Sequence, residues 1–191
     1  MDRREALKLL ASVPLASAFS VSRAEVARAQ EAARAAGSDF VPRFFAPHEY
    51  RTVRTLVDLI LPADERSGSA TDAGVPEFLD FMMVDQPLLQ IAIRGGLAWI
   101  DLECGERFGK RFADGTREEQ GVLLDLIAWP DRAPDELSHG VEFFNRFRDL
   151  TATGFFTSRM GFEDLRYQGN EFVTDWTGCP DEALRRLGLK D

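Results

Sequence analysis

The chain has 191 residues, of which 45% are hydrophobic and 29% charged, so it is long enough for one domain with a buried core. Its net charge at pH 7 is −9, and residues 48–191 alone carry 16 basic and 27 acidic side chains. A surface this acidic repels the phosphates of nucleic acids and the headgroups of anionic lipids, which argues against binding to either of them.

The N-terminal segment predicts an export signal. Arg3 and Arg4 form a basic pair, and the uncharged stretch 9–21 is shorter than the roughly 20 apolar residues that span a bilayer. This pattern is typical of a signal peptide, and paired arginines indicate the twin-arginine route, which carries proteins already folded. The alternative is an ordinary amphipathic helix over 5–21, but Pro14 and the lack of a polar stripe disfavour it.

Two candidate cleavage sites follow the apolar stretch. Small residues stand at the required positions in Ala16-Ser17-Ala18 and again in Ser22-Arg23-Ala24, and the sequence favours neither. We divide the chain into a signal peptide over 1–24, an Ala-rich connector over 25–47 and a helical domain over 48–191. The connector has almost no apolar face, which is why we expect it to lie outside the domain.

Beyond the connector, helical periodicity predicts an all-α fold, a compact single-domain bundle of about five to seven helices. Thr116 and Glu119 form a capping-box pattern at one helix start. After Thr151 the pattern becomes an irregular, aromatic-rich C-terminal part, and no run alternates long enough to predict a strand. The expected helices follow Pro47, Gly74, Pro87, the pair Gly95-Gly96, Thr116 and the turn at 130–140, with a short last one at Pro180.

The two cysteines, Cys104 and Cys179, allow two interpretations. Export would place them in an oxidising compartment, where a pair tends to form a disulfide. Alternatively they are two separately buried thiols, since Cys104 lies on an apolar helical stripe and Cys179 precedes a proline in an expected loop.

No catalytic, cofactor-binding or metal-binding residue is predicted. His48 and His139 are the only histidines, and the sequence has no nucleophile elbow, phosphate loop or dinucleotide fingerprint. The fifteen phenylalanines are instead enough to fill a core and to leave some aromatic rings for a partner. The residues that we expect on such a partner surface are Phe143, Phe155, Phe156 and Tyr167.

Several segments between residues 48 and 172 resemble the gluconate 2-dehydrogenase subunit 3 family. The pairing of ILPAD with GVPEF across a loop of this length is fairly specific, and the later segments reinforce it. The segments are LVDLILPAD at 56–64, AGVPEFLD at 73–80, Gly96-Leu97 ahead of Phe108, LTATGFFTSRMG at 150–161 and YQGN at 167–170.

The resemblance implies a non-catalytic small subunit of a membrane-bound, FAD-dependent sugar or polyol dehydrogenase complex. In such complexes a large flavoprotein holds FAD and oxidises the substrate, and a multihaem cytochrome c subunit passes the electrons on. The small subunit is expected to bind the flavoprotein, to aid its maturation and to carry it through the twin-arginine translocon. We therefore expect a periplasmic protein held at the membrane through the complex, without a span of its own after processing. The alternative is a stand-alone periplasmic helical module that binds a ligand or a partner.

Overall fold

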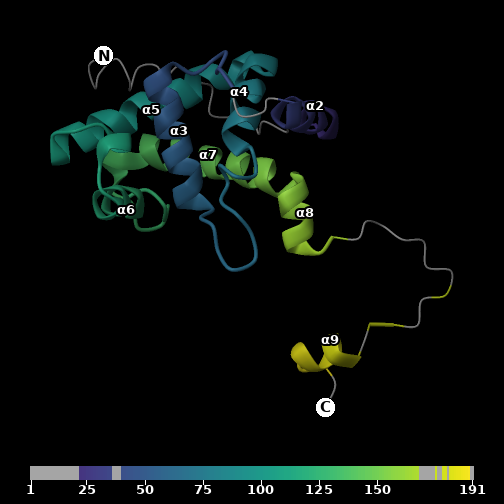
Figure 1. The fold of residues 1–191 in the computed structure, drawn as a ribbon. Helices are drawn as coiled ribbons and strands as arrows, with labels where there is room; N and C mark the ends of the chain where they lie inside the picture. The colour runs from purple at the N-terminus through teal and green to yellow at the C-terminus, as the bar shows by residue number, and fades with distance from the viewer. Residues whose placement is uncertain (1–21, 36–39, 168–174, 176–177, 180, 190–191) are drawn as a thin grey trace.

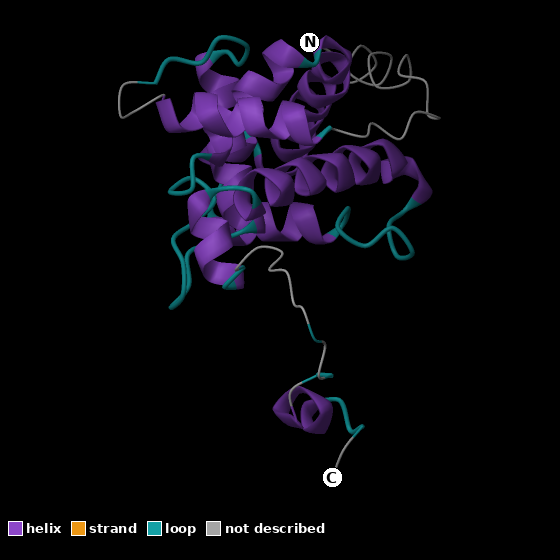
Figure 2. Ribbon diagram, turned by 90° about the vertical axis from the view of Figure 1, so that its right-hand side faces the viewer, coloured by secondary structure: helices purple, strands orange, loops and turns teal. Residues whose placement is uncertain are grey.

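The computed structural model describes residues 22–35, 40–167, 175, 178–179 and 181–189. In this part of the chain the fold is all-α, as predicted, without strands but with eight α-helices, more than the expected five to seven (Figure 1, Figure 2). They are α2 (Arg23–Ala35), α3 (Pro47–Ile60), α4 (Val75–Asp85), α5 (Pro87–Phe108), α6 (Arg117–Asp125), α7 (Ser138–Phe156), α8 (Arg159–Leu165) and α9 (Asp181–Arg186), with the 3₁₀ turns η1 (Phe112–Asp114) and η2 (Asp135–Leu137).

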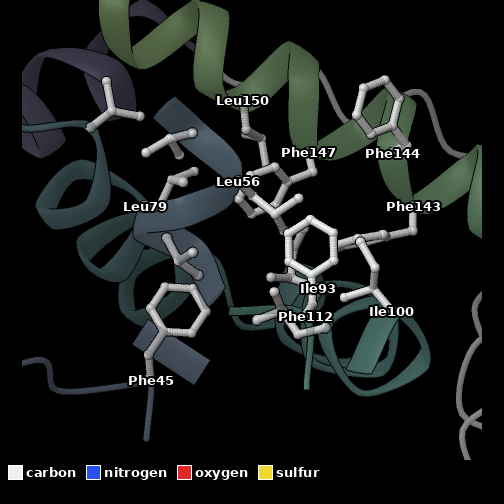
Figure 3. Close-up of a cluster of buried hydrophobic side chains, with 14 of the residues drawn as sticks. Phe45, Leu56, Leu79, Ile93, Ile100, Phe112, Phe143, Phe144, Phe147 and Leu150 are labelled. Carbon is white, nitrogen blue, oxygen red and sulfur yellow. The ribbon is translucent and has the colours of Figure 1, made fainter. Parts of the chain in front are cut away.

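The core lies where α3, α4 and α5 meet α7. The apolar stripes predicted from the sequence face inward, and Figure 3 shows Phe147 and Leu150 of α7 directed toward the side chains of the other helices. The predicted cap is confirmed, since Thr116 Oγ1 accepts the N–H of Glu119 at 3.3 Å. The largest fully buried side chains include Trp99, Phe78, Phe112, Phe147, Leu56 and Ile100.

Helix α5 corrects one expectation. The pair Gly95-Gly96 was expected to separate two helices, but both glycines lie inside one helix of 22 residues. A Cβ at Gly96 would lie 1.8 Å from Cδ2 of Phe143 on α7, and a Cβ at Gly140 would lie 2.2 Å from Cη2 of Trp99 on α5. These glycines therefore allow α5 and α7 to approach closely, and they do not end a helix.

The expected connector is also largely part of the folded body, because residues 23–35 form α2, which packs on α4 and α7. Ala29 is completely buried, and the Nε2 of Gln30 donates to the carbonyl of Gly154 at 2.6 Å. Alanine gives little apolar signal in a sequence, yet its small side chain lets one helix backbone lie close against another. The division between signal peptide and mature chain stays a prediction, since residues 1–21 lie outside the described part.

The stretch after Thr151 is helical as far as Leu165, which corrects the expectation of an irregular segment there. Helix α7 continues to Phe156, and Ser158 then caps α8 by accepting the N–H of Gly161 at 3.1 Å. Gly161 sits against backbone, because a Cβ there would lie 2.1 Å from the carbonyl oxygen of Phe155. Its role is again close packing. The short last helix appears as predicted, as α9.

A buried carboxylate fixes the chain that leads into α3. Asp80 of α4 is 1% exposed and accepts three backbone N–H groups, those of Arg43 at 2.8 Å and of Phe44 and Phe45 at 3.0 Å each. Segment 43–45, where the chain bends ahead of α3, is thereby held on α4, with the Phe45 ring buried in the core (Figure 3).

Candidate partner-binding surface

Segments that carry the family resemblance meet at one place, where the loop 61–74 contacts α8. The loop is internally ordered by Asp64, whose Oδ1 accepts the N–H groups of Arg66 at 2.8 Å and of Ser67 at 2.9 Å. These hydrogen bonds, that of Arg66 foremost, lower the pKa of the Asp64 carboxyl. Arg66 then reaches α8, where its Nη2 lies 2.9 Å from Oδ1 of Asp164. The ILPAD loop and the segment after TGFFTS thus form one continuous surface.

A cleft of about 360 Å³ opens between this loop, α2 and α8. Its charged side chains are of both signs, and Arg159 is already paired with Glu163 at 2.8 Å. This balance gives the cleft no preference for an anionic or a cationic ligand. The residues that line it are Gln30, Ala33, Arg34, Asp72, Ala73, Gly74, Ser158, Arg159, Met160 and Glu163.

Next to the cleft, α8 presents apolar side chains to solvent. Phe162 is 40% exposed, Leu165 one turn further on is 55% exposed, and Tyr167 just after the helix is 54% exposed. The rings of Phe162 and Tyr167 lie together, with their centroids 5.4 Å apart. We call these three residues the α8 surface. Large apolar side chains that are exposed together are typical of a protein-binding site.

The structure divides the four predicted partner residues. Phe143 and Phe155 are each 3% exposed and belong to the core, so their assignment to a partner surface is wrong. Phe143 fills the space above Gly96, which only the packing of α5 on α7 reveals. Phe156 is half-buried and packs against the core, with its ring 5.2 Å from that of Phe155. Tyr167 alone is exposed as expected.

Sequence reasoning missed Phe162 and Leu165. The signal was available, because the two residues are three positions apart and so share one face of any helix through this segment. That segment was expected to be irregular, so the spacing was not read as a helix face.

Both cysteines are free thiols in the structure, Cys104 buried in α5 and Cys179 exposed. Neither alternative from the sequence matches this arrangement completely, because there is no bridge and only one thiol is buried. Burial raises the pKa of the Cys104 thiol, which keeps it protonated and unreactive.

We expect a thiol reagent such as iodoacetamide at neutral pH to modify only Cys179 in the native chain. After unfolding in urea, both thiols are expected to react. Mass spectrometry of the labelled peptides distinguishes the residues, and a Cys179→Ser variant should show no native labelling. A native chain in which neither thiol reacts until it is reduced would contradict the free-thiol state and would favour the disulfide.

The histidines and the other possible metal ligands do not form a site in the described part of the chain. His48 at the start of α3 is exposed, and His139 at the start of α7 is half-buried. In the described ranges no group of three or more His, Cys, Asp or Glu residues is placed to hold a metal ion. Nor does any helix among the described residues combine the length and the apolarity that crossing a membrane requires. Arg3 and Arg4 lie outside the described residues.

The fold and its exposed surface thus define an all-helical domain that offers an apolar helix face beside a small cleft. A family model described as gluconate 2-dehydrogenase subunit 3 matches residues 47–174, and the chain belongs to this family. The match confirms the resemblance and names a subunit of a dehydrogenase. It covers α3 to α8, including the loop 61–74 and the α8 surface, whereas α2 precedes it. Comparisons with curated proteins and with solved structures gave no match.

Proposed function

We propose that this protein is the non-catalytic small subunit of a membrane-bound, FAD-dependent dehydrogenase of the gluconate type. It binds the large flavoprotein, aids its maturation and carries it to the periplasm by the twin-arginine route. Membership of the subunit 3 family is the observation that carries this proposal. FAD and haem c belong to the partner subunits, so the small subunit supplies binding surface and the export signal.

Co-purification from native membranes tests the association. We expect a tagged full-length chain to bring with it a yellow partner whose flavin is released as FAD on denaturation. A cytochrome c subunit in the same eluate would extend the complex. Recovery of the chain alone, under conditions in which dehydrogenase activity stays in the membrane, would contradict the proposal and favour a stand-alone module.

Within this proposal the α8 surface contacts the flavoprotein. We expect Leu165→Glu to reduce the recovered flavoprotein about tenfold or more, because a carboxylate buried in an apolar interface costs more than 1.4 kcal/mol. The complex is weakened because an apolar contact is replaced by an unpaired charge that loses its water. The measurement is the ratio of FAD to tagged chain in the eluate.

Val122→Glu is the matched control for Leu165→Glu. Val122 is an apolar residue of α6 with 51% exposure, and α6 lies at the opposite end of the molecule from α8 in Figure 1. The free energy of unfolding of each variant should lie within about 0.5 kcal/mol of the wild-type value, because both side chains are exposed. Equal flavoprotein recovery with the two variants would exclude the α8 surface as the contact.

The export role is tested at the paired arginines. We expect the Arg3→Lys/Arg4→Lys variant to leave both this chain and the flavoprotein in the cytoplasm, because the twin-arginine signal is read through both guanidinium groups. Fractionation followed by FAD and immunoblot analysis provides the measurement. The control is Arg23→Lys/Arg34→Lys, which makes the same exchange at two exposed positions of α2. Normal export of the flavoprotein with the first variant would disprove the carrier role.

A further inference from the structure

The second candidate cleavage site coincides with the capped start of α2. The Oε2 of Glu25 accepts the N–H of Ser22 at 2.6 Å, and the Oγ of Ser22 accepts the N–H of Glu25 at 3.3 Å. The carbonyl of Ser22 also accepts the N–H of Val26 at 3.1 Å, so Ser22 already takes part in the helix. Ser22-Arg23-Ala24 is therefore the cap and first turn of a helix in the folded chain.

This first turn is fastened to the rest of the molecule. The other carboxylate oxygen of Glu25 accepts a hydrogen bond from Nε2 of Gln86 at 2.6 Å, at the end of α4. One turn later, Nη2 of Arg28 lies 2.9 Å from Oδ2 of Asp85, and Ala29 next to it is completely buried. Gln30 adds hydrogen bonds to the carbonyl of Gly154 and to Oγ1 of Thr157. Unwinding the first turn of α2 would break the hydrogen bond of Glu25 to Gln86, and unwinding as far as Gln30 would also break the contact with α7.

Signal peptidases act on an exposed, locally unfolded chain with small residues before the scissile bond. A twin-arginine passenger folds before it crosses the membrane, so α2 is already docked when the peptidase meets the chain. We propose that the fold protects Ser22-Arg23-Ala24 from signal peptidase, so that any cleavage occurs before Ser22 and the mature subunit keeps the whole of α2. This inference rests on the twin-arginine export in the proposed function.

One substitution, made at each candidate site, tests the inference. Gln at the position before the scissile bond blocks cleavage, so Ala18→Gln closes the upstream site and Ala24→Gln closes the downstream one. Ala24 is exposed in α2, where Gln is a good helix former, so the fold is preserved. The intact mass and N-terminal sequence of the chain are then measured in the periplasmic and membrane fractions.

We expect Ala24→Gln to be processed like the wild type, with the N-terminus at or before Ser22. Ala18→Gln should lose cleavage after Ala18 without switching to the downstream site. A product that begins at Glu25, from the wild type or from Ala18→Gln, would overturn the inference.

A second experiment separates protection by the fold from a site that is simply never recognised, and it needs no export. Purified full-length chain is incubated with purified signal peptidase in detergent, as the wild type and as Ala29→Asp. The buried aspartate should release α2, which hydrogen exchange of the α2 amides verifies. We expect the product that begins at Glu25 only from Ala29→Asp. Its absence from that variant would overturn protection by the fold, whereas failure of export in cells would affect only the proposed function.

Discussion

Gly96→Ala is expected to destabilise the protein by about 3 kcal/mol, at the upper end of the cost of overpacking a core. The added Cβ would lie 1.8 Å from Cδ2 and 2.2 Å from Cγ of Phe143, so the collision is with the inner atoms of a ring and not with a flexible chain end. Phe143 is 3% exposed and its ring lies 5.6 Å from that of Phe147, which leaves it little room to move. Relief therefore requires α5 and α7 to separate. Urea unfolding of the purified chain, followed by circular dichroism, measures the change.

Gly121→Ala is the matched control. Gly121 also lies inside a helix, α6, but no atom outside the local helix backbone comes within 4 Å of the position of an added Cβ. Helix propensity then acts alone, so alanine should stabilise the chain by about 0.5–1 kcal/mol. Opposite signs for the two glycines are the expected result. A stabilising Gly96→Ala would show that the two helices are not in close contact.

These two glycines also show how much of the fold the sequence reveals. Apolar periodicity was enough to predict α3, α4, α6 and α7, because each buries one face. The sequence does not distinguish a glycine that ends a helix from one that leaves room for a neighbouring ring. The pair at 95–96 therefore suggested a helix break that does not exist. The difference depends on Phe143, 47 positions away, and no local pattern reports it.

Helix α2 escaped prediction for a related reason. Its buried residues are Ala29 and Gln30, which carry little hydrophobic signal. Their burial depends on the hydrogen bonds that Gln30 makes to Gly154 and Thr157, more than 120 residues away. The Ala-rich composition indicates a helix, but it does not indicate which surface of the protein that helix covers.

Of the four residues predicted for a partner surface, only Tyr167 is exposed. The abundance of phenylalanine does not tell which rings are exposed, because exposure depends on the face of each helix. Phe143 and Phe147 share a helical stripe with Leu150, which in hindsight marks them as core. The exposed residues Phe162 and Leu165 follow a capped turn at Ser158, where glycine-spaced sequence concealed a short helix.

The family segments have a structural role that the sequence alone did not suggest. The loop 61–74 is held by Asp64 and by the ion pair between its Arg66 and Asp164 of α8. Asp80, the last residue of AGVPEFLD, instead faces inward and holds segment 43–45. The loop 61–74 therefore shapes the outer surface near α8, and Asp80 fixes the segment that leads into α3. Partner binding and stability are thus expected to depend on different residues of the same motif.

Asp80→Ala is accordingly expected to destabilise the protein by about 3 kcal/mol, because it leaves three backbone N–H groups without their acceptor. The loss exceeds that of an ordinary hydrogen bond, since the acceptor is a buried carboxylate that serves Arg43, Phe44 and Phe45 together. Asp80→Asn should cost less, about 1–2 kcal/mol, because its carbonyl oxygen still accepts, although its amide group donates where an acceptor is needed.

Hydrogen exchange shows which part of the chain loses stability in Asp80→Ala. In Asp80→Ala the amides of residues 43–45 should exchange faster than those of α5, because the segment and the buried Phe45 ring come away from α4 together. Asp149→Ala is the control, since Asp149 carries an exposed ion pair with Arg148 on α7 and its loss should change stability by less than about 0.5 kcal/mol. Equal stability of the two alanine variants would mean that segment 43–45 is held by the Phe45 ring and not by the carboxylate.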